Sequence, residues 1–225
     1  MKFTHPAINR VFDTDIDKVN SLIIENQQLF SDVIQDIRNQ IDGFDGKSVL
    51  SDKNDLIPFQ KNAEILSQFI PFELNQKTLV NKAVSALEQI AVSGEYFKET
   101  AEILSKIEAY LLEISSNLSC DCNFSKISAG AIIKASGFEF KEDYDNLCEK
   151  IIDYFELVTE FDRKKLFFTV NLRSYVSDKE MELFIETVIQ HGYNLLMIES
   201  GEHPLLKSEQ RYIIDSALCE ICGND

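Results

Sequence analysis

The stretch RKKLFFTVNLRSYVSDKEMELFIETVIQHGYNLLMIES, residues 163–200, constrains the fold more than any other part of this chain. It begins and ends with near-continuous apolar runs, which are typical of parallel strands covered on both faces. Between these runs, Ser177 and Glu180 have the spacing of a helix capping box, and His191-Gly192 predicts where that helix ends. The stretch therefore predicts a strand, a helix and a second parallel strand, as found in nucleotide-binding enzymes.

The N-terminal third contains a second candidate unit of this kind. Residues 20–26, NSLIIEN, form a short apolar run with strand character, and residues 47–52, KSVLSD, form another. The segment between them places apolar residues at helical spacing, at Leu29, Val33, Ile37 and Ile41. We therefore expect a first strand, helix and strand unit in this region.

The pattern changes between the two units. Residues 75–133 contain no proline and keep a three-four spacing of apolar residues, which predicts two or three long amphipathic helices. The fold expected is therefore α/β, with a parallel or mixed sheet interrupted by a helical insertion. We assign residues 1–72 and 138–225 to a discontinuous α/β head and residues 73–137 to a helical leg.

The net charge limits the classes of partner. Twenty-two basic residues against thirty-eight acidic ones give a formal charge of −16, which argues against a chain that coats nucleic acid or an anionic membrane with its whole surface. A local basic patch remains compatible with this balance. The chain has no apolar run long enough for a membrane span and no hydrophobic signal core, so we expect a cytoplasmic protein with no membrane partner.

The cysteines favour free thiols over a disulfide framework. Five cysteines are an odd number in a long chain, which fits a reducing compartment. The Cys-x-Cys pair at 120–122 and the Cys-x-x-Cys pair at 219–222 could share a zinc ion only if the fold joined them.

The tripeptide Gly46-Lys47-Ser48 has part of the sequence of a phosphate-binding loop. That loop needs a glycine five residues before the Gly of Gly-Lys-Ser, with a strand before the loop and a helix after it. Position 41 is Ile41, and here a helix is expected before the tripeptide and a strand after it. The motif rule therefore favours an exposed turn lysine over a phosphate ligand of an ATPase.

Two polar residues, Asn171 and Glu199, follow or end the parallel strands of residues 163–200. In α/β folds ligands bind at this edge of the sheet. Two interpretations stay open: the side chains bind loop amides and close the strand ends, or they take part in catalysis. No nucleophile signature such as Gly-x-Ser-x-Gly accompanies them.

The order of these motifs resembles a family of small adaptation proteins of subtype II-A CRISPR loci, which form rings and bind DNA ends. The similar segments are SLIIEN and SVLSDK, EILSQFIPFELNQKTLVNKAVSALEQI, AIIKASGFEF, and KKLFFTVNLRSYVSDKEM with LLMIE. Together they extend from Asn20 to Glu199.

The resemblance implies an α/β head similar to a truncated P-loop kinase, helical legs and assembly into a homotetrameric ring. It further implies sequence-independent binding of linear double-stranded DNA in the central hole, calcium as a cofactor, and no catalytic activity. The expected partners are the CRISPR integrase and the guide-directed nuclease in spacer acquisition. Asp121 is the residue that matches a carboxylate of the family's acidic cluster.

Four lysines are candidates for the DNA contacts: Lys47, Lys53, Lys61 and Lys134, the last from the Lys-x-x-Gly segment. We expect them in turns, away from acidic helix faces. Two alternatives to DNA binding remain. One is a degenerate nucleotide-dependent phosphotransferase that uses Asn171 and Glu199 near magnesium, and the other is a protein-interaction scaffold without DNA contact.

Overall fold

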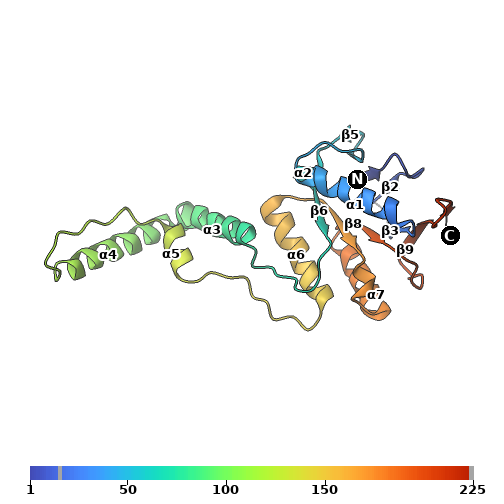
Figure 1. The fold of residues 1–225 in the computed structure, drawn as a ribbon. Helices are drawn as coiled ribbons and strands as arrows, with labels where there is room; N and C mark the ends of the chain where they lie inside the picture. The colour runs from blue at the N-terminus through green and yellow to red at the C-terminus, as the bar shows by residue number, and fades with distance from the viewer. Residues whose placement is uncertain (15–16, 223–225) are drawn as a thin grey trace. The chain divides into compact units, whose positions relative to one another are not determined.

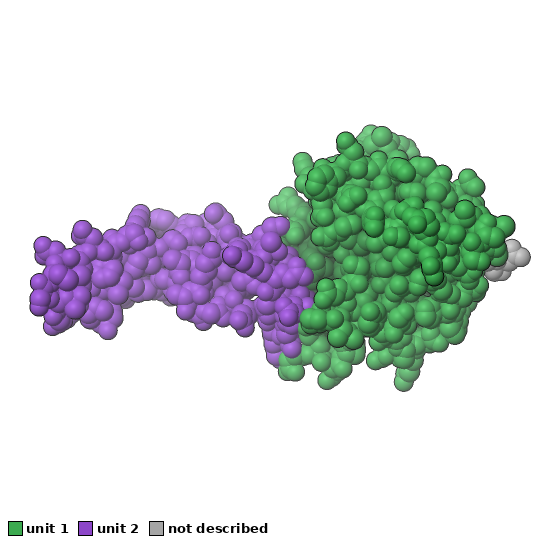
Figure 2. Space-filling view, in the orientation of Figure 1, with its two compact units in different colours: residues 1–72, 143–225 green, residues 73–142 purple. Residues whose placement is uncertain are grey.

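The computed structural model describes residues 1–14 and 17–222. The chain divides into two compact units, one formed by Met1–Phe72 with Asp143–Asp225 and the other by Glu73–Glu142 (Figure 2). We call them the head unit and the leg unit. The described part of the chain is mixed α/β, with seven α-helices and two β-sheets.

The head unit is built on a six-stranded sheet with the order β10-β9-β3-β8-β7-β6. Five neighbouring strands of this sheet are parallel, and only β10 runs antiparallel to its neighbour β9. The strand bounds are β3 Val19–Ile24, β6 Ala63–Leu66, β7 Leu166–Val170, β8 Asn194–Glu199, β9 Glu209–Ile214 and β10 Glu220–Cys222. The residues of β3 and β7 are all buried, as expected for strands covered on both faces.

The strand, helix and strand predicted for residues 163–200 are confirmed. Strand β7 pairs in parallel with β8, and helix α7, Asp178–Gln190, connects them after the short 3₁₀ turn η2, Leu172–Ser174. Both hydrogen bonds of the capping box between Ser177 and Glu180 are present. The helix ends at His191, and Gly192 then adopts a positive φ of +69°, a backbone conformation that glycine tolerates without strain.

The prediction of a strand, helix and strand unit in residues 20–52 is partly wrong. Helix α1, Gln27–Ile41, forms as expected, but β4, Val49–Asp52, belongs to a second sheet and not to the sheet of β3. That sheet is antiparallel, with the order β2-β1-β4-β5, where β1 is Lys2–Thr4, β2 is Phe12–Asp13 and β5 is Asp55–Leu56. The physical reason lies in β4 itself, because Leu50 is its only fully buried residue and a central parallel strand needs two apolar faces.

The two faces of the large sheet are covered differently (Figure 1). On one face, Phe168 of β7 packs edge-on against Phe3 of β1, with 5.2 Å between ring centroids, and stacks on Phe59 of the short helix α2, Phe59–Asn62. Helix α1 contributes to the same apolar core. On the other face, Phe155 of helix α6, Leu147–Asp162, stacks on Phe167 with 3.9 Å between centroids.

The leg unit is helical as predicted, but only two of its helices are long and the third is short. Its helices are α3, Lys77–Ala91, α4, Phe97–Ser115, and α5, Ala129–Ala135, with the 3₁₀ turn η1, Gly94–Tyr96, between α3 and α4. The two chain segments at its base are joined by Asn75, whose amide group exchanges hydrogen bonds with the backbone of Phe140. Glu142 adds a carboxylate that accepts from the amides of Leu74 and Asn75.

Within residues 1–14 and 17–222, no helix combines the length and the apolar character needed to cross a bilayer.

Candidate nucleic-acid interface and strand-end site

The side chains of Asn171 and Glu199 close the ends of β7 and β8 in a crossed arrangement. The Asn171 Oδ1 atom accepts a hydrogen bond of 2.8 Å from the amide of Ser200, just beyond β8. The Glu199 Oε1 atom accepts one of 3.3 Å from the amide of Arg173, just beyond β7. Each strand end is therefore tied to the loop that follows its neighbour. Of the two interpretations, this arrangement fits side chains that bind loop amides and close the strand ends.

Arg173 extends this strand-end site into an ion cluster in which Arg173 and Glu209 are buried and Asp178 is exposed. Its guanidinium donates to Glu209 Oε2 at 3.2 Å and to Asp178 Oδ1 at 2.6 Å. The Glu209 carboxylate also accepts from the amide of Leu206 and from Arg211. Burying such charges is costly unless each one is paired, so the cluster fixes the segments that contribute to it.

This ion cluster was not predicted from the sequence. Arg173 follows β7, whereas Glu209 and Arg211 lie on β9, a strand that was not predicted. The available signal was the run Tyr212, Ile213 and Ile214, because aromatic and β-branched residues favour strands.

Glu199 has one oxygen bonded and one without a hydrogen-bond partner among the described residues. Its Oε2 atom lies 3.8 Å from His203 Nε2, beyond hydrogen-bond distance. Burial raises the pKa of Glu199 to about 7, although Arg173 acts to lower it. Burial also lowers the pKa of His203, with the positive charge of Arg173 acting in the same direction.

The Gly46-Lys47-Ser48 turn binds a carboxylate of its own chain. Asp36 of α1 accepts from the amide of Lys47 at 2.6 Å and from the amide of Ser48 at 2.8 Å. Although burial acts to raise the pKa of Asp36, hydrogen bonds from Ser48, Lys47 and Gln40 outweigh it and lower that pKa. These amides, which would cradle a phosphate in a phosphate-binding loop, are therefore occupied by Asp36.

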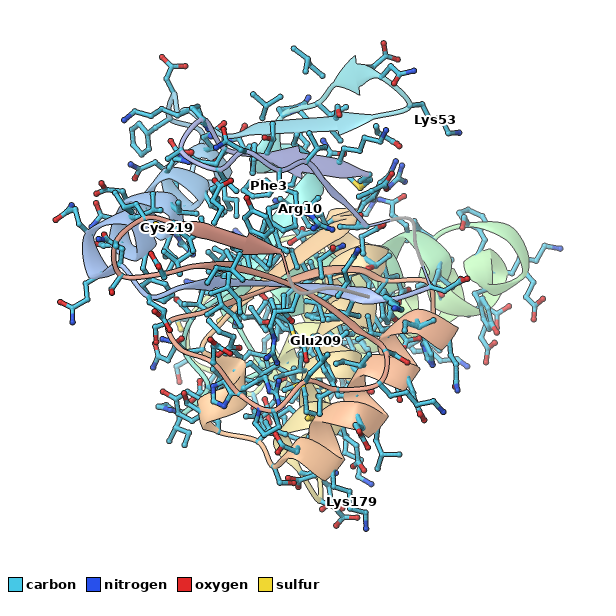
Figure 3. All side chains as sticks on the ribbon, turned by 90° about the vertical axis from the view of Figure 1, so that its right-hand side faces the viewer. Phe3, Arg10, Lys53, Lys179, Glu209 and Cys219 are labelled. Carbon is cyan, nitrogen blue, oxygen red and sulfur yellow. The ribbon has the colours of Figure 1, made fainter. Side chains whose placement is uncertain are left out.

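The candidate lysines are all exposed, and they come from separate elements. Lys47 lies in the loop between α1 and β4. Lys53 is at the tip of the β4–β5 hairpin, where Lys53 and Asn54 both have positive φ values, as in a two-residue hairpin turn (Figure 3). The expectation that all four lie in turns is wrong for Lys61 and Lys134, which lie in the last turns of α2 and α5.

Asp121, the expected calcium ligand, is exposed in the non-helical segment between α4 and α5. Among the side chains that the structure describes, no three from His, Cys, Asp and Glu are grouped closely enough to hold a metal ion. Asp121 is therefore one carboxylate without two such described side chains grouped around it, whereas calcium takes six to eight oxygen ligands. Four of the cysteines are free thiols, at 120, 122, 148 and 219, and the side chain of Cys222 lies outside the described part.

The family model of the CRISPR-associated protein Csn2 matches residues 40–218, which is most of the chain. The chain belongs to the Csn2 family. The match includes the whole leg unit, the lysines from Lys47 onward and the strand-end site, so the resemblance inferred from the motif order is confirmed. A CRISPR-associated role follows from this membership. No curated protein matches the chain.

The buried position of Glu199 leads to a prediction about pH. The folded-state pKa is raised from 4.5 to about 7, so between these values the folded chain holds a proton that the unfolded chain has lost. The Glu199 contribution to the free energy of unfolding therefore falls as pH rises through this range. Glu199→Gln removes this dependence and should gain up to about 3 kcal/mol relative to wild type between pH 4.5 and pH 8.

Denaturant unfolding of wild type and Glu199→Gln at both ends of that range measures this difference. The exposed Glu182 of α7 provides the control variant Glu182→Gln, which should follow wild type at each pH. An equal stability difference for Glu199→Gln at both pH values would contradict the raised pKa.

Proposed function

We propose that this Csn2 family member assembles through its leg unit into a homotetrameric ring that binds the ends of linear double-stranded DNA without sequence preference. The ring serves spacer acquisition and catalyses no reaction. The observation that carries the proposal is the state of helix α4, none of whose residues is buried in the single chain.

Helix α4 has an apolar surface that this chain leaves largely exposed, with Ile107 half-buried. Ile103, Ile107, Tyr110 and Ile114 follow a four-three-four spacing, which is the pattern of a coiled-coil seam. The exposed fraction is 46% for Ile103, 60% for Tyr110 and 43% for Ile114. A contiguous exposed apolar surface of this kind marks a protein interface, and helices from other copies of the same chain fit its repeat.

Ring assembly also reconciles the acidic chain with a polyanionic ligand. A closed ring directs one surface of every copy towards a shared hole, so each lysine that faces the hole is repeated around it. Positive potential is then concentrated there while the acidic residues face outward. Lys47, Lys53, Lys61 and Lys134 are the candidates for these contacts.

We propose that the chain is not catalytic because the polar groups at the two candidate sites already form hydrogen bonds within the chain. Asn171 and Glu199 hold loop amides, and Asp36 occupies the amides of the Lys47 turn. We therefore propose that the head unit retains the frame of a truncated P-loop kinase without its phosphate chemistry. ATP turnover that is lost in Asn171→Ala would instead support the phosphotransferase alternative.

We propose that calcium is a cofactor of the assembled ring. We further propose the CRISPR integrase and the guide-directed nuclease as its partners. Because calcium takes several oxygen ligands, we propose that Asp121 shares the ion with ligands from another subunit.

The topology of the DNA tests the proposed function. A ring that is entered from a DNA end should bind linear duplex and leave a covalently closed circle of the same sequence largely unbound. Electrophoretic mobility shift with both forms, and with the circle after cutting by a restriction enzyme, measures the difference. Equal affinity for both forms would contradict end binding, and binding to neither form would favour the protein-interaction scaffold.

The lysines predict a salt dependence. Affinity falls as salt rises, and the slope of log affinity against log salt should become less steep by about 0.9 for each phosphate contact removed. Because each residue is repeated in four subunits, one substitution removes up to four contacts. Lys53→Glu and Lys134→Glu should therefore weaken binding of linear duplex and flatten its salt dependence. Both side chains are exposed, so the thermal midpoint should stay close to that of wild type.

Lys179→Glu is the matched control, because Lys179 is exposed on α7 and lies at the opposite end of the head unit from Lys53 (Figure 3). It changes the charge equally and should leave the salt slope unchanged. Wild-type affinity and slope in both Lys53→Glu and Lys134→Glu would show that the DNA contacts another surface.

A further inference from the structure

Helices α6 and α7 of the head unit enclose a groove with an apolar floor. The groove has a volume of about 230 Å³ and is open to solvent. Cys148, Ile152 and Phe184 lie at its base and are buried, whereas Leu183 lines it with 57% of its surface exposed. An exposed leucine beside buried apolar side chains favours contact with another apolar group.

The walls of the same groove carry carboxylates. Glu149 and Asp153 of α6 and Glu180 of α7 all line it. Hydrogen bonds from the Ser177 side chain and backbone lower the pKa of Glu180, so this group is ionised at neutral pH. Burial raises the pKa of the Cys148 thiol to about 12, with Glu180 and Glu149 adding to the effect, so the floor stays uncharged.

The acidic character extends along both helices. Together α6 and α7 carry nine acidic residues and two lysines, a net charge of 2 − 9 = −7, out of −16 for the whole chain. The acidic residues are Glu149, Asp153, Glu156, Glu160, Asp162, Asp178, Glu180, Glu182 and Glu186, and the lysines are Lys150 and Lys179. This surface repels nucleic acid and anionic lipid, and it attracts a basic protein segment.

We propose that the α6–α7 groove is a docking site for a basic amphipathic helix of a partner protein. Apolar side chains on one face of that helix contact Leu183 and the floor of the groove. Lysine or arginine side chains on either side of the apolar face pair with Glu149, Asp153 and Glu180. A helix in an apolar groove is a recurrent mode of peptide recognition, and the charges fix its position and orientation.

The assay uses a synthetic helical peptide of leucine and lysine, with the leucines at three-four spacing, and measures its binding to the full chain by fluorescence anisotropy. Wild type should bind this peptide, with an affinity that decreases as salt increases. Leu183→Ser and Asp153→Lys should each weaken binding about tenfold. A peptide with serine in place of leucine should bind much more weakly than the original.

Glu160→Lys is the matched control for Asp153→Lys, because Glu160 is exposed on the same helix but does not line the groove. It should leave the affinity within about twofold of wild type, since exposed charges further away are screened. The docking site is overturned by any of three results: no binding to wild type, equal weakening by Glu160→Lys and Asp153→Lys, or equal binding of the leucine and serine peptides.

The docking site stands or falls separately from DNA binding. Leu183→Ser should leave the affinity for linear duplex DNA unchanged, because the groove repels phosphate. A loss of DNA binding in Leu183→Ser, with an intact fold by thermal midpoint, would assign the groove to DNA and overturn the proposal.

Discussion

The double-sided burial of the central parallel strands is the constraint on which the head unit depends. Polar groups that follow such strands are removed from water, so they have to find partners within the chain. The crossed hydrogen bonds of Asn171 and Glu199 and the pairing of Arg173 with Glu209 provide these partners. The edge of the sheet where related folds bind ligands is therefore occupied by the chain itself.

The two units differ in how far they satisfy their own surfaces. The head unit buries aromatic side chains on both faces of its large sheet, including Phe168 on one side and Phe167 on the other. In the leg unit, α3 buries Leu79, Ala83 and Val84, but α4 buries no residue at all. A long helix in water draws most of its stability from packing of its apolar face, and this consideration supports the proposed assembly through α4.

Local signals in the sequence predicted the elements better than their pairing. The capping box at Ser177 and the apolar runs on either side of it predicted α7 and the parallel pair β7 and β8. The KSVLSD segment was correctly predicted as a strand, but its sheet depended on contacts of Leu50 with the distant N-terminal strand, which no local pattern contains. Arg173 was missed for the same reason, since its partner Glu209 lies on a strand far along the chain.

The charge distribution joins the two functional proposals. The acidic surface of α6 and α7 is suited to a basic protein, whereas the proposed DNA contacts use exposed lysines of other elements. Both proposals treat this Csn2 family member as a binding module, and the proposed ring depends on α4. Ile103 belongs to the apolar surface of α4, whereas Ala109 lies on the polar side of the same helix.

Native mass spectrometry of wild type, Ile103→Glu and Ala109→Glu tests the central claim most directly. The two substitutions add the same charge to exposed positions of one helix. We expect a tetramer for wild type and Ala109→Glu, and dissociation to smaller species for Ile103→Glu. A wild-type monomer, or an Ile103→Glu tetramer as stable as wild type, would contradict it.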